Sequence, residues 1–184
     1  MAAVVPHLTV HEVTAERWPD FERLFETRGG PKSCWCMVWR PSAGKSGAAR
    51  KAEMKRRIDE GTPIGLLGYL KGEPVAWCSV APRASYRRLV SNGSPDDGIW
   101  SMACFFIVRP LRGMGLSEQL IAAAKKSARR HGAKALEAYP VDADSPSYRF
   151  MGQLPLFERA GFEAIGREGK RRHVVQLKLS NRKT

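Results

Sequence analysis

The chain has 184 residues, of which 31 are lysine or arginine and 18 are acidic, so its formal net charge is +13. Its length suits one domain (1–184), and its hydrophobic fraction of 43% is ordinary for a globular protein. No segment approaches the roughly 18 apolar residues of a membrane span, and no signal peptide is expected from the first dozen residues, which lack a basic start followed by a long apolar run. The composition excludes a membrane protein, indicates a cytoplasmic one with reduced cysteines, and favours polyanionic partners.

The first third of the chain predicts a strand, a helix, an irregular segment and a second helix. Residues 8–13 alternate between apolar and polar side chains, as a half-buried strand does. Residues 14–30 carry apolar side chains at helical spacing, with Thr14 as the expected N-cap. The segment SCWCMVWR (33–40) lies between turn-rich flanks and is expected to be irregular. Residues 48–61 predict a strongly basic helix.

The remainder predicts a strand–turn–helix–strand unit between two hairpins. One hairpin is expected at 63–83 and the other at 162–179. Residues 98–108 are the most apolar run and are long enough for a central strand. The other expected elements are a polar excursion at 84–97, an amphipathic helix at 117–132, a strand at 133–141 and a helix at 147–161 that is interrupted near Pro155. The pattern indicates a mixed α/β fold.

The segment RPLRGMGL (109–116) joins the apolar strand to the amphipathic helix through a turn with Gly113 and Gly115. Glycine lets a backbone come close to a ligand and adopt conformations that other residues avoid. The first amides of the helix are unpaired donors at the positive end of its dipole, so they form an anion site. The turn therefore predicts a phosphate site, and a pyrophosphate fits it.

This arrangement resembles the GNAT superfamily of N-acetyltransferases, whose signature is Arg or Gln, two residues, Gly, one residue, and Gly or Ala. Arg112, Gly115 and Ser117 occupy these positions, with serine in place of the last small residue. Further similar segments are LFERAGF (156–162) and, shared with a subset of the family, CWCM…WR, WCSVAPR (77–83) and EAYPVD (137–142). The resemblance implies a mixed, mostly antiparallel sheet of six to seven strands with about four helices, splayed at its central strands.

The resemblance also implies the donor and the reaction. The enzyme would be an N-acyltransferase, a monomer or homodimer, that moves an acyl group from acetyl-CoA or another acyl-CoA to a small-molecule amine. Its pyrophosphate would lie on the amides of residues 113–117, and its pantetheine between the strand that ends at Val108 and the one at 134–140. The cofactor-binding residues implied are Phe106, Ile107, Val108, Arg112, Gly113, Met114, Gly115, Leu116 and Ser117.

The sequence does not decide which groups transfer protons. The tyrosine that often protonates the leaving thiolate in this family falls at position 157, which is a phenylalanine here. Either Tyr148 or Tyr139 replaces it, or no dedicated acid is needed, because a thiolate leaves readily. Glu137 and Asp142 are the candidate bases, and alternation puts Glu137 on the same strand face as Tyr139. The expected catalytic residues are Glu137, Tyr139 and Tyr148.

The segment SCWCMVWR has two interpretations. The resemblance implies that it lines the acceptor side of the cleft. The residues implied there are Trp35, Cys36, Trp39 and Arg40. Alternatively, Trp35, Met37 and Trp39 alternate into the core and the cysteines are small buried hydrophobes. No metal is expected, because Cys34 and Cys36 lack ligand spacing and no histidine pair supplements them, and the C-x-C spacing does not fit a thiol–disulfide motif.

The charge distribution keeps a second function open. Residues 40–57 include seven basic side chains and one acid, and residues 125–134 include five basic side chains and no acid. A few GNAT-like proteins use aminoacyl-tRNA as an aminoacyl donor or acylate it, and two basic helices would neutralise its phosphates. The residues expected to contact tRNA are Lys51, Lys55, Arg56, Lys125, Lys126, Arg129 and Arg130. A GNAT-shaped module that only binds a ligand is a third alternative.

Overall fold

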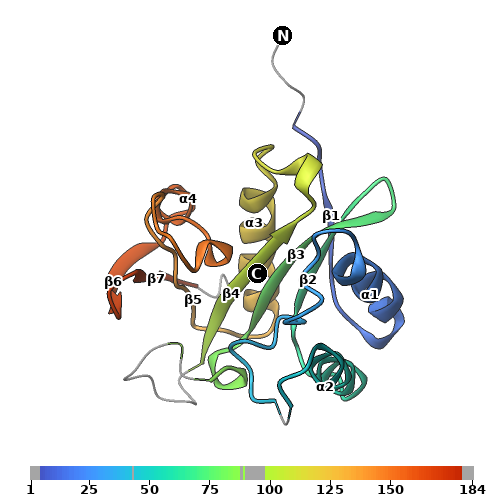
Figure 1. The fold of residues 1–184 in the computed structure, drawn as a ribbon. Coiled ribbons are helices and arrows are strands. Elements are labelled where there is room, and N and C mark those ends of the chain that lie inside the picture. The colour runs from blue at the N-terminus through green and yellow to red at the C-terminus, as the bar shows by residue number, and fades with distance from the viewer. Residues whose placement is uncertain (1–4, 43, 88, 90–97, 180–184) are drawn as a thin grey trace.

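Seven strands form a mixed, open sheet through the molecule (Figure 1). The computed structural model describes residues 5–42, 44–87, 89 and 98–179. The strands are β1 (Thr9–Glu12), β2 (Gly65–Leu70), β3 (Glu73–Pro82), β4 (Ile99–Ile107), β5 (Ala135–Ala138), β6 (Glu163–Glu168) and β7 (Arg172–Lys178). Their order is β1-β2-β3-β4-β5-β7-β6, and all neighbours are antiparallel except β4 and β5. The predicted mixed, mostly antiparallel sheet is confirmed.

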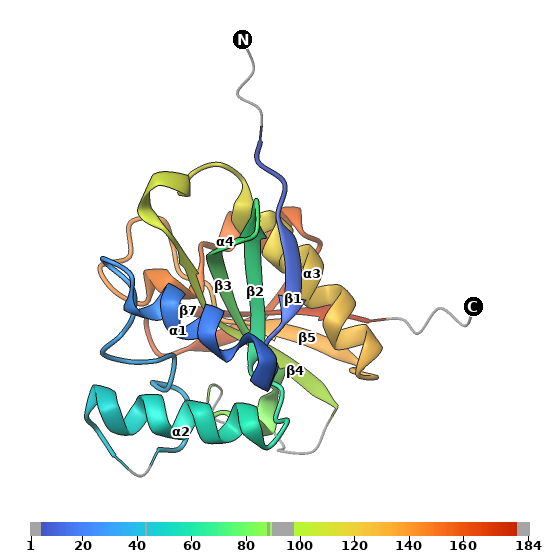
Figure 2. The ribbon, with the colours of Figure 1, turned by 90° about the vertical axis from the view of Figure 1, so that its right-hand side faces the viewer.

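Helices cover both faces of the sheet (Figure 2). Helices α1 (Trp18–Glu26) and α2 (Gly47–Asp59) pack on one face, and α3 (Leu116–Arg130) packs on the other, beside the short α4 (Leu154–Arg159). Neighbouring residues of β2 mark the two cores, because side chains alternate along a strand. Leu66 belongs to the core under α3, whereas Leu67 belongs to the core under α1 and α2.

Local sequence signals account for most of the element boundaries. The hairpin between β2 and β3 turns at Lys71 and Gly72, whose φ angles of 51° and 83° suit a two-residue turn. Helix α2 is capped by the Ser46 hydroxyl, which accepts a hydrogen bond from the amide of Ala49 at 3.1 Å. The expected cap at Thr14 is wrong, because a 3-10 turn over Ala15–Arg17 separates it from α1 and its side chain makes no capping bond.

The C-terminal helix expected at 147–161 is two shorter pieces. A 3-10 turn spans Arg149–Met151, and α4 begins only at Leu154, with Pro155 in its first turn, where a missing amide donor costs nothing. Two more 3-10 turns span Arg83–Ser85 and Arg109–Leu111. Most of the excursion expected at 84–97 lies outside the described residues. Within the described ranges, no helix combines the length and apolarity that crossing a membrane requires.

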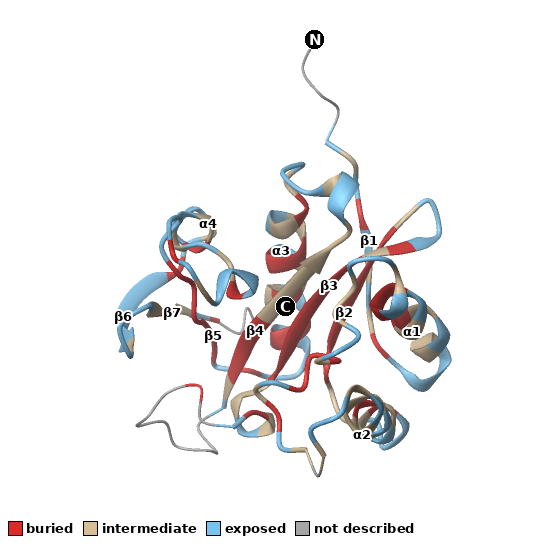
Figure 3. Cartoon of the chain, in the orientation of Figure 1, coloured by how far each residue is buried: buried red, intermediate tan, exposed pale blue. Residues whose placement is uncertain are grey.

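The two central strands separate halfway along β4. Strand β5 pairs with β4 only over Ile99–Met102, so from Cys104 onward β4 is hydrogen-bonded to β3 alone. The register with β3 also slips here, since Ser79 lies opposite Cys104 and the next residue of β3 lies opposite Met102. Ala103 therefore sits in a β-bulge without a strand partner on either side. Figure 3 shows that β4 changes from buried to half-buried at this end, where the sheet opens.

Candidate functional site

The turn between β4 and α3 presents backbone donors to solvent. Gly113 and Gly115 have φ angles of 77° and 75°, in the left-handed region that glycine adopts without strain. Gly115 is the N-cap of α3, and no side chain caps the helix there. A Cβ at Gly113 would meet no atom within 4 Å. The first amides of a 15-residue helix thus remain open to an anion, as the sequence predicts.

The residues around this turn divide into a structural set and an open set. Arg112 ties the turn to the strand, because its Nε donates to the carbonyl oxygen of Ile107 at 2.9 Å and its guanidinium lies 6.0 Å from the centre of the Phe106 ring. Leu116 is 1% exposed and packs in the core, so only its backbone can face a ligand. Met114, by contrast, is 43% exposed beside the turn.

An apolar pocket opens where β4 leaves β5. Its volume is about 290 Å³, and its walls are the free half of β4, the segment before α2, and the 3-10 turn before α4. The lining residues are Pro31, Cys34, Cys36, Val38, Trp39, Arg40, Ser79, Tyr86, Ala103, Cys104, Phe105, Phe106 and Phe150. None of these side chains is a carboxylate. The pocket and the glycine turn therefore lie along the same half of β4.

The segment SCWCMVWR serves both as core and as pocket wall. Trp35 is 2% exposed and stacks on Phe25 with ring centres 5.5 Å apart, so its expected contact with an acceptor is corrected: the ring is part of the core. Cys36, Trp39 and Arg40 line the pocket. Sequence reasoning missed the opposite wall, which comes from Tyr86, Ala103, Cys104 and Phe150.

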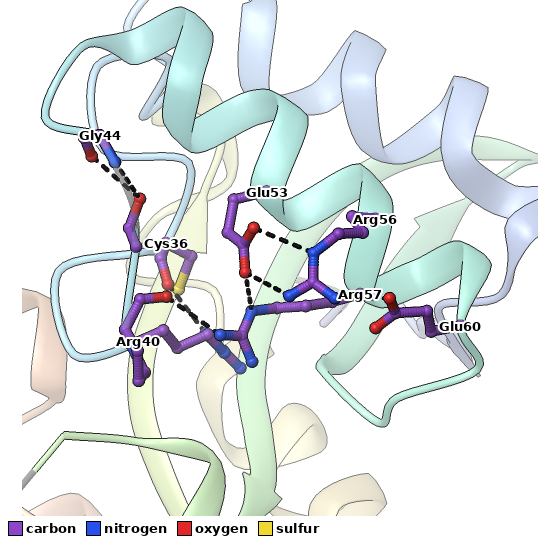
Figure 4. Close-up of polar contacts among 9 residues, drawn as sticks. Cys36, Arg40, Gly44, Glu53, Arg56, Arg57 and Glu60 are labelled. Atoms are coloured by element: carbon purple, nitrogen blue, oxygen red, sulfur yellow. Dashed lines mark hydrogen bonds and ion pairs between the residues drawn. The ribbon is translucent and has the colours of Figure 1, made fainter.

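Arg40 organises this segment from inside the protein. Its guanidinium is 1% exposed and donates to the carbonyl oxygen of Cys36 at 2.8 Å (Figure 4). It donates a second bond to the carbonyl oxygen of Ile64 at 2.7 Å. It also donates to the Tyr86 hydroxyl at 3.2 Å, which lies 2.9 Å from Ser79 Oγ. Arg40 is thus a buried cation that joins the loop to β3, rather than a free contact for an anionic acceptor.

Glu137 and Tyr139 lie in a buried hydrogen-bond network beneath the paired half of the sheet. The Tyr139 hydroxyl donates to Glu137 Oε1 at 2.8 Å and lies 2.7 Å from Ser101 Oγ. Arg83 and Gln176 each donate a hydrogen bond to the same carboxylate, at 3.1 Å. Burial and the neighbouring Glu137 charge raise the pKa of Tyr139 well above its ordinary value. Neither side chain lines the pocket, so their expected catalytic roles are not supported by their placement.

Tyr148 lies at the rim of the pocket. Its ring is 6.2 Å from that of Trp39, and the Arg172 guanidinium lies over both rings, at 4.7 Å from Trp39 and 5.7 Å from Tyr148. Its hydroxyl-bearing side chain is 37% exposed. Phe157, at the position where the family often has tyrosine, is fully buried and packs 5.3 Å from the Phe162 ring. Tyr148 therefore stays the one predicted catalytic residue near the pocket.

The basic residues of α2 that are predicted to contact tRNA form ion pairs with acidic side chains of the protein. The pairs are Lys51 with Glu22 and Glu26, Lys55 with Asp59, and Arg56 with Glu53 and Glu60. The charge of this helix is therefore largely neutralised within the molecule. The helix lies on the opposite face of the sheet from α3 (Figure 2), and the C-terminal ends of the two helices line one hollow through Asp59 and Ser127.

The basic residues of α3 are partly engaged. Lys125 donates to the carbonyl oxygen of Ala160, and Arg130 pairs with Glu12 at 2.6 Å. Lys126 and Arg129 are exposed and form no ion pair within the described part of the chain. Of the seven predicted tRNA contacts, these two are the most available to a phosphate.

The sequence matches the profile of the Acetyltransferase (GNAT) family over residues 11–162. The match includes β4, the glycine turn, α3 and α4. The chain therefore belongs to the GNAT family, and it is an acyltransferase of that family. A search of curated protein sequences finds no significant match.

Solved structures of acetyltransferases share the fold at low sequence identity. Ribosomal-protein-alanine N-acetyltransferase from Brucella melitensis is 17% identical with a TM-score of 0.57, over 94% of this chain and 100% of that one. The yncA acetyltransferase from Salmonella typhimurium, with its cofactor acetyl-CoA, is 15% identical with a TM-score of 0.55, over 96% of each chain. An aminoglycoside acetyltransferase in complex with coenzyme A is 14% identical with a TM-score of 0.60, over 94% and 95%.

Proposed function

We propose that the protein is an N-acyltransferase that moves an acyl group from acetyl-CoA or another acyl-CoA to the amine of a small molecule. The observation that carries this proposal is the arrangement along β4. An uncapped helix N-terminus follows one end of its free half, and a pocket opens beside that half. Two similar structures hold acetyl-CoA or coenzyme A, which supports the same class of donor here.

The donor would be held mainly by backbone. The amides of residues 113–117 would bind its pyrophosphate, because they are donors at the positive end of the α3 dipole. The free edge of β4 would bind its pantetheine, because the backbone groups that face away from β3 have no strand partner beyond Met102. The residues that would bind the pantetheine through the backbone of this edge are Phe106, Ile107 and Val108. Met114 would contact the donor through its exposed side chain.

The reaction needs a donor to the developing oxyanion and a path for two protons. When bound, the acyl-CoA supplies the thioester that the amine attacks. The bulge at Ala103 leaves backbone amides of β4 free beside the pocket, and such preorganised donors stabilise an oxyanion. Tyr148, at the rim, is the described hydroxyl group best placed to exchange a proton with solvent. The apolar lining of the pocket excludes water from the thioester.

The pocket favours an acceptor with an apolar or aromatic body. Aromatic rings surround it, and no lining side chain offers a carboxylate to a cationic amine. This differs from what a polycationic acceptor such as an aminoglycoside would require. A single neutral amine on an apolar scaffold fits the lining better.

The aminoacyl-tRNA alternative stays a prediction. The net charge of +13 favours it, whereas the ion pairs along α2 reduce the charge available to phosphates. The cytoplasmic location and the monomeric or dimeric state expected from the sequence also stay predictions.

Thermal unfolding with millimolar acetyl-CoA tests the donor, because a ligand that binds only the folded state raises the unfolding temperature. Intact-mass assays with a library of apolar amines, polyamines and charged tRNA then test the acceptor. We expect stabilisation by acetyl-CoA and acylation of apolar amines. An unchanged unfolding temperature would remove the donor proposal. Binding of tRNA that weakens steeply with salt would favour the alternative.

A further inference from the structure

The Cys36 thiol lies where the pocket meets the free half of β4. Its residue lines the pocket together with Ala103 and Cys104 and is 7% exposed. The indole Nε1 of Trp77 donates to its sulfur at 3.3 Å. A donor directed at sulfur stabilises a thiolate more than a thiol. Cys36 is therefore a nucleophilic atom in the wall of the proposed acyl-transfer site.

The positive charge around Cys36 favours an anion at this position. The Arg40 guanidinium is 1% exposed, and its described hydrogen-bond partners are two carbonyl oxygens and one hydroxyl. No carboxylate within the described residues forms an ion pair with it. Arg57, beside it in Figure 4, adds positive charge and shares Glu53 with Arg56. A buried cation without a counter-ion is unfavourable, and a thiolate at Cys36 would supply one.

The titratable groups that face Cys36 agree with this charge state. A hydrogen bond from the Cys104 thiol lowers the pKa of Cys36, and Arg40 and the donors on Trp77 and Ser79 lower it further, to about 6, although burial opposes them. The pKa of Cys104 is raised well above its ordinary value, so it is the protonated partner. The other facing groups, Cys34, Cys78 and Tyr86, have raised pKa values and stay protonated at neutral pH.

The backbone at this position is held in an unfavourable conformation. Trp35 and Cys36 have φ angles of 46° and 56°, in the left-handed region that non-glycine residues avoid. The buried Trp35 ring and a hydrogen bond from the Cys36 amide to Cys34 Sγ, at 3.4 Å, hold them there. Strain of this kind persists where the surroundings over-determine a functional geometry. Here it holds Cys36 at the edge of the core that contains Trp35, where the residue also lines the pocket.

We propose that Cys36 accepts the acyl group first, so that transfer runs through an acyl-enzyme; this rests on the proposed function. The thiolate attacks the thioester carbonyl, a new carbon–sulfur bond forms, and coenzyme A leaves as the thiolate. The amine then attacks the acyl-Cys36 thioester, the Cys36 thiolate leaves, and the proton lost by the amine passes to the released thiolate or to solvent. No general acid is needed in the first half, which is consistent with a phenylalanine at position 157.

Two measurements that do not depend on turnover test the inference. The protein is incubated with excess acetyl-CoA without an acceptor, the reaction is quenched in acid, and the intact mass of the protein is measured. We expect a mass gain of one acetyl group that maps to the Cys36 peptide and is removed by neutral hydroxylamine. Alkylation by iodoacetamide should rise with pH around a midpoint below neutrality, whereas free cysteine titrates near 8.5.

Matched variants separate Cys36 from its neighbours. Cys36→Ser and Cys36→Ala should both lose the acetyl adduct, whereas Cys78→Ala, at a buried thiol outside the pocket lining, should keep it. Arg40→Met should move the alkylation midpoint toward that of free cysteine, and Arg40→Lys should move it less because the charge remains. Circular dichroism and unfolding curves identify any variant that fails to fold.

The outcomes also separate this inference from the proposed function. Stabilisation by acetyl-CoA without an adduct at Cys36, or full turnover in Cys36→Ala, would overturn the acyl-enzyme and leave the proposed function standing. If acetyl-CoA produces no stabilisation and no adduct, both the acyl-enzyme and the proposed function are overturned. An adduct that maps to Cys34 in the native protein would likewise overturn the inference.

Discussion

Glu137 Oε1 lies 3.1 Å from Nη1 of Arg83, in an ion pair whose side chains are only 2% and 12% exposed. The pair connects β5 to the 3-10 turn that follows β3, beneath the part of the sheet where β4 and β5 are still joined. It thus stabilises the closed half of the sheet, next to the open half that contains the pocket. The carboxylate has a structural environment, with Tyr139 and Gln176 also bonded to it.

We expect Glu137→Gln to act on stability rather than on chemistry. The substitution removes the negative charge of a buried ion pair with Arg83, and breaking such a pair costs about 3 kcal/mol. Urea unfolding should show this loss, while kcat of the folded variant stays close to that of the native enzyme. A stable variant with a strongly reduced kcat would show instead that Glu137 is a catalytic base.

Tyr139→Phe is the matched control within the same network. It removes one neutral donor to Glu137 and keeps the ring, so we expect a loss of about 1 kcal/mol, smaller than that of Glu137→Gln. Equal losses in the two variants would show that the charge of Glu137 contributes nothing beyond its hydrogen bonds.

Gly115→Ala should weaken donor binding more than it weakens the fold. A Cβ there would meet Val5 Cγ1 at 3.6 Å and Glu118 Oε2 at 3.9 Å, which are ordinary contacts, so the cost to stability is the left-handed φ, about 1 kcal/mol. The added methyl group would stand at the N-terminus of α3, where the pyrophosphate is proposed to bind. We expect the Kd of acetyl-CoA, measured by calorimetry, to rise about tenfold or more, equivalent to 1.4 kcal/mol.

Gly132→Ala provides the control for backbone strain. Gly132 follows the other end of α3 with a φ angle of 74°, and a Cβ there would meet nothing within 4 Å. This variant should lose similar stability and keep the native Kd for acetyl-CoA. If both variants bound acetyl-CoA equally weakly, the loss would come from stability and the proposed donor site would be wrong.

The fold was predictable where local signals and burial agree. The apolar run at 98–108 identifies β4, and Gly72 identifies the hairpin between β2 and β3. The start of α1 was not predicted correctly, because a 3-10 turn intervenes after Thr14. Pro19 predicts a distorted first turn and lies in the first turn of α1, but the residues of the 3-10 turn also suit the start of a helix, so the boundary itself does not follow from the sequence.

The site was predictable only where it is local. The glycine turn is contiguous in sequence, so its backbone donors follow from the pattern Arg112 to Ser117. Alternation correctly puts Glu137 and Tyr139 on one face, yet their burial depends on Arg83 and Gln176, which are 54 and 39 residues from Glu137.

Alternation failed in the segment SCWCMVWR for a backbone reason. Two consecutive left-handed residues, Trp35 and Cys36, interrupt the extended conformation on which alternation depends. Trp35 therefore enters the core while Trp39 lines the pocket. Because neither left-handed residue is a glycine, the sequence carries no signal for this turn.

Glu12 should make stability depend on pH in the acid range. Burial alone raises the pKa of Glu12, but hydrogen bonds from Ser127, Arg130 and His131 lower it from 4.5 to about 2. Because the folded-state pKa is depressed, its stabilisation is fully present above pH 4.5 and is lost as the pH falls toward 2. The group is partly exposed, so solvent screening limits the effect to about 1 kcal/mol.

Urea unfolding of Glu12→Gln and the native protein at a series of pH values measures this effect. The difference in free energy of unfolding should be largest near neutrality and should shrink as the pH falls below 4.5. A difference that does not change with pH would show that the carboxylate charge has no role in joining β1 to α3.

Phe150→Ala should weaken binding of the acceptor and leave binding of the donor unchanged. Phe150 is 39% exposed and lines the pocket from the 3-10 turn before α4, so its truncation removes apolar wall without leaving a buried cavity. Loss of such a contact costs about 1–2 kcal/mol, which corresponds to a rise in the acceptor KM of about tenfold. Ile165→Ala, at an exposed apolar residue of β6 outside the pocket lining, should leave both KM values unchanged. A larger rise in the KM for acetyl-CoA than in that for the amine would mean that the pocket binds the donor, and the assignment of this wall to the acceptor would be wrong.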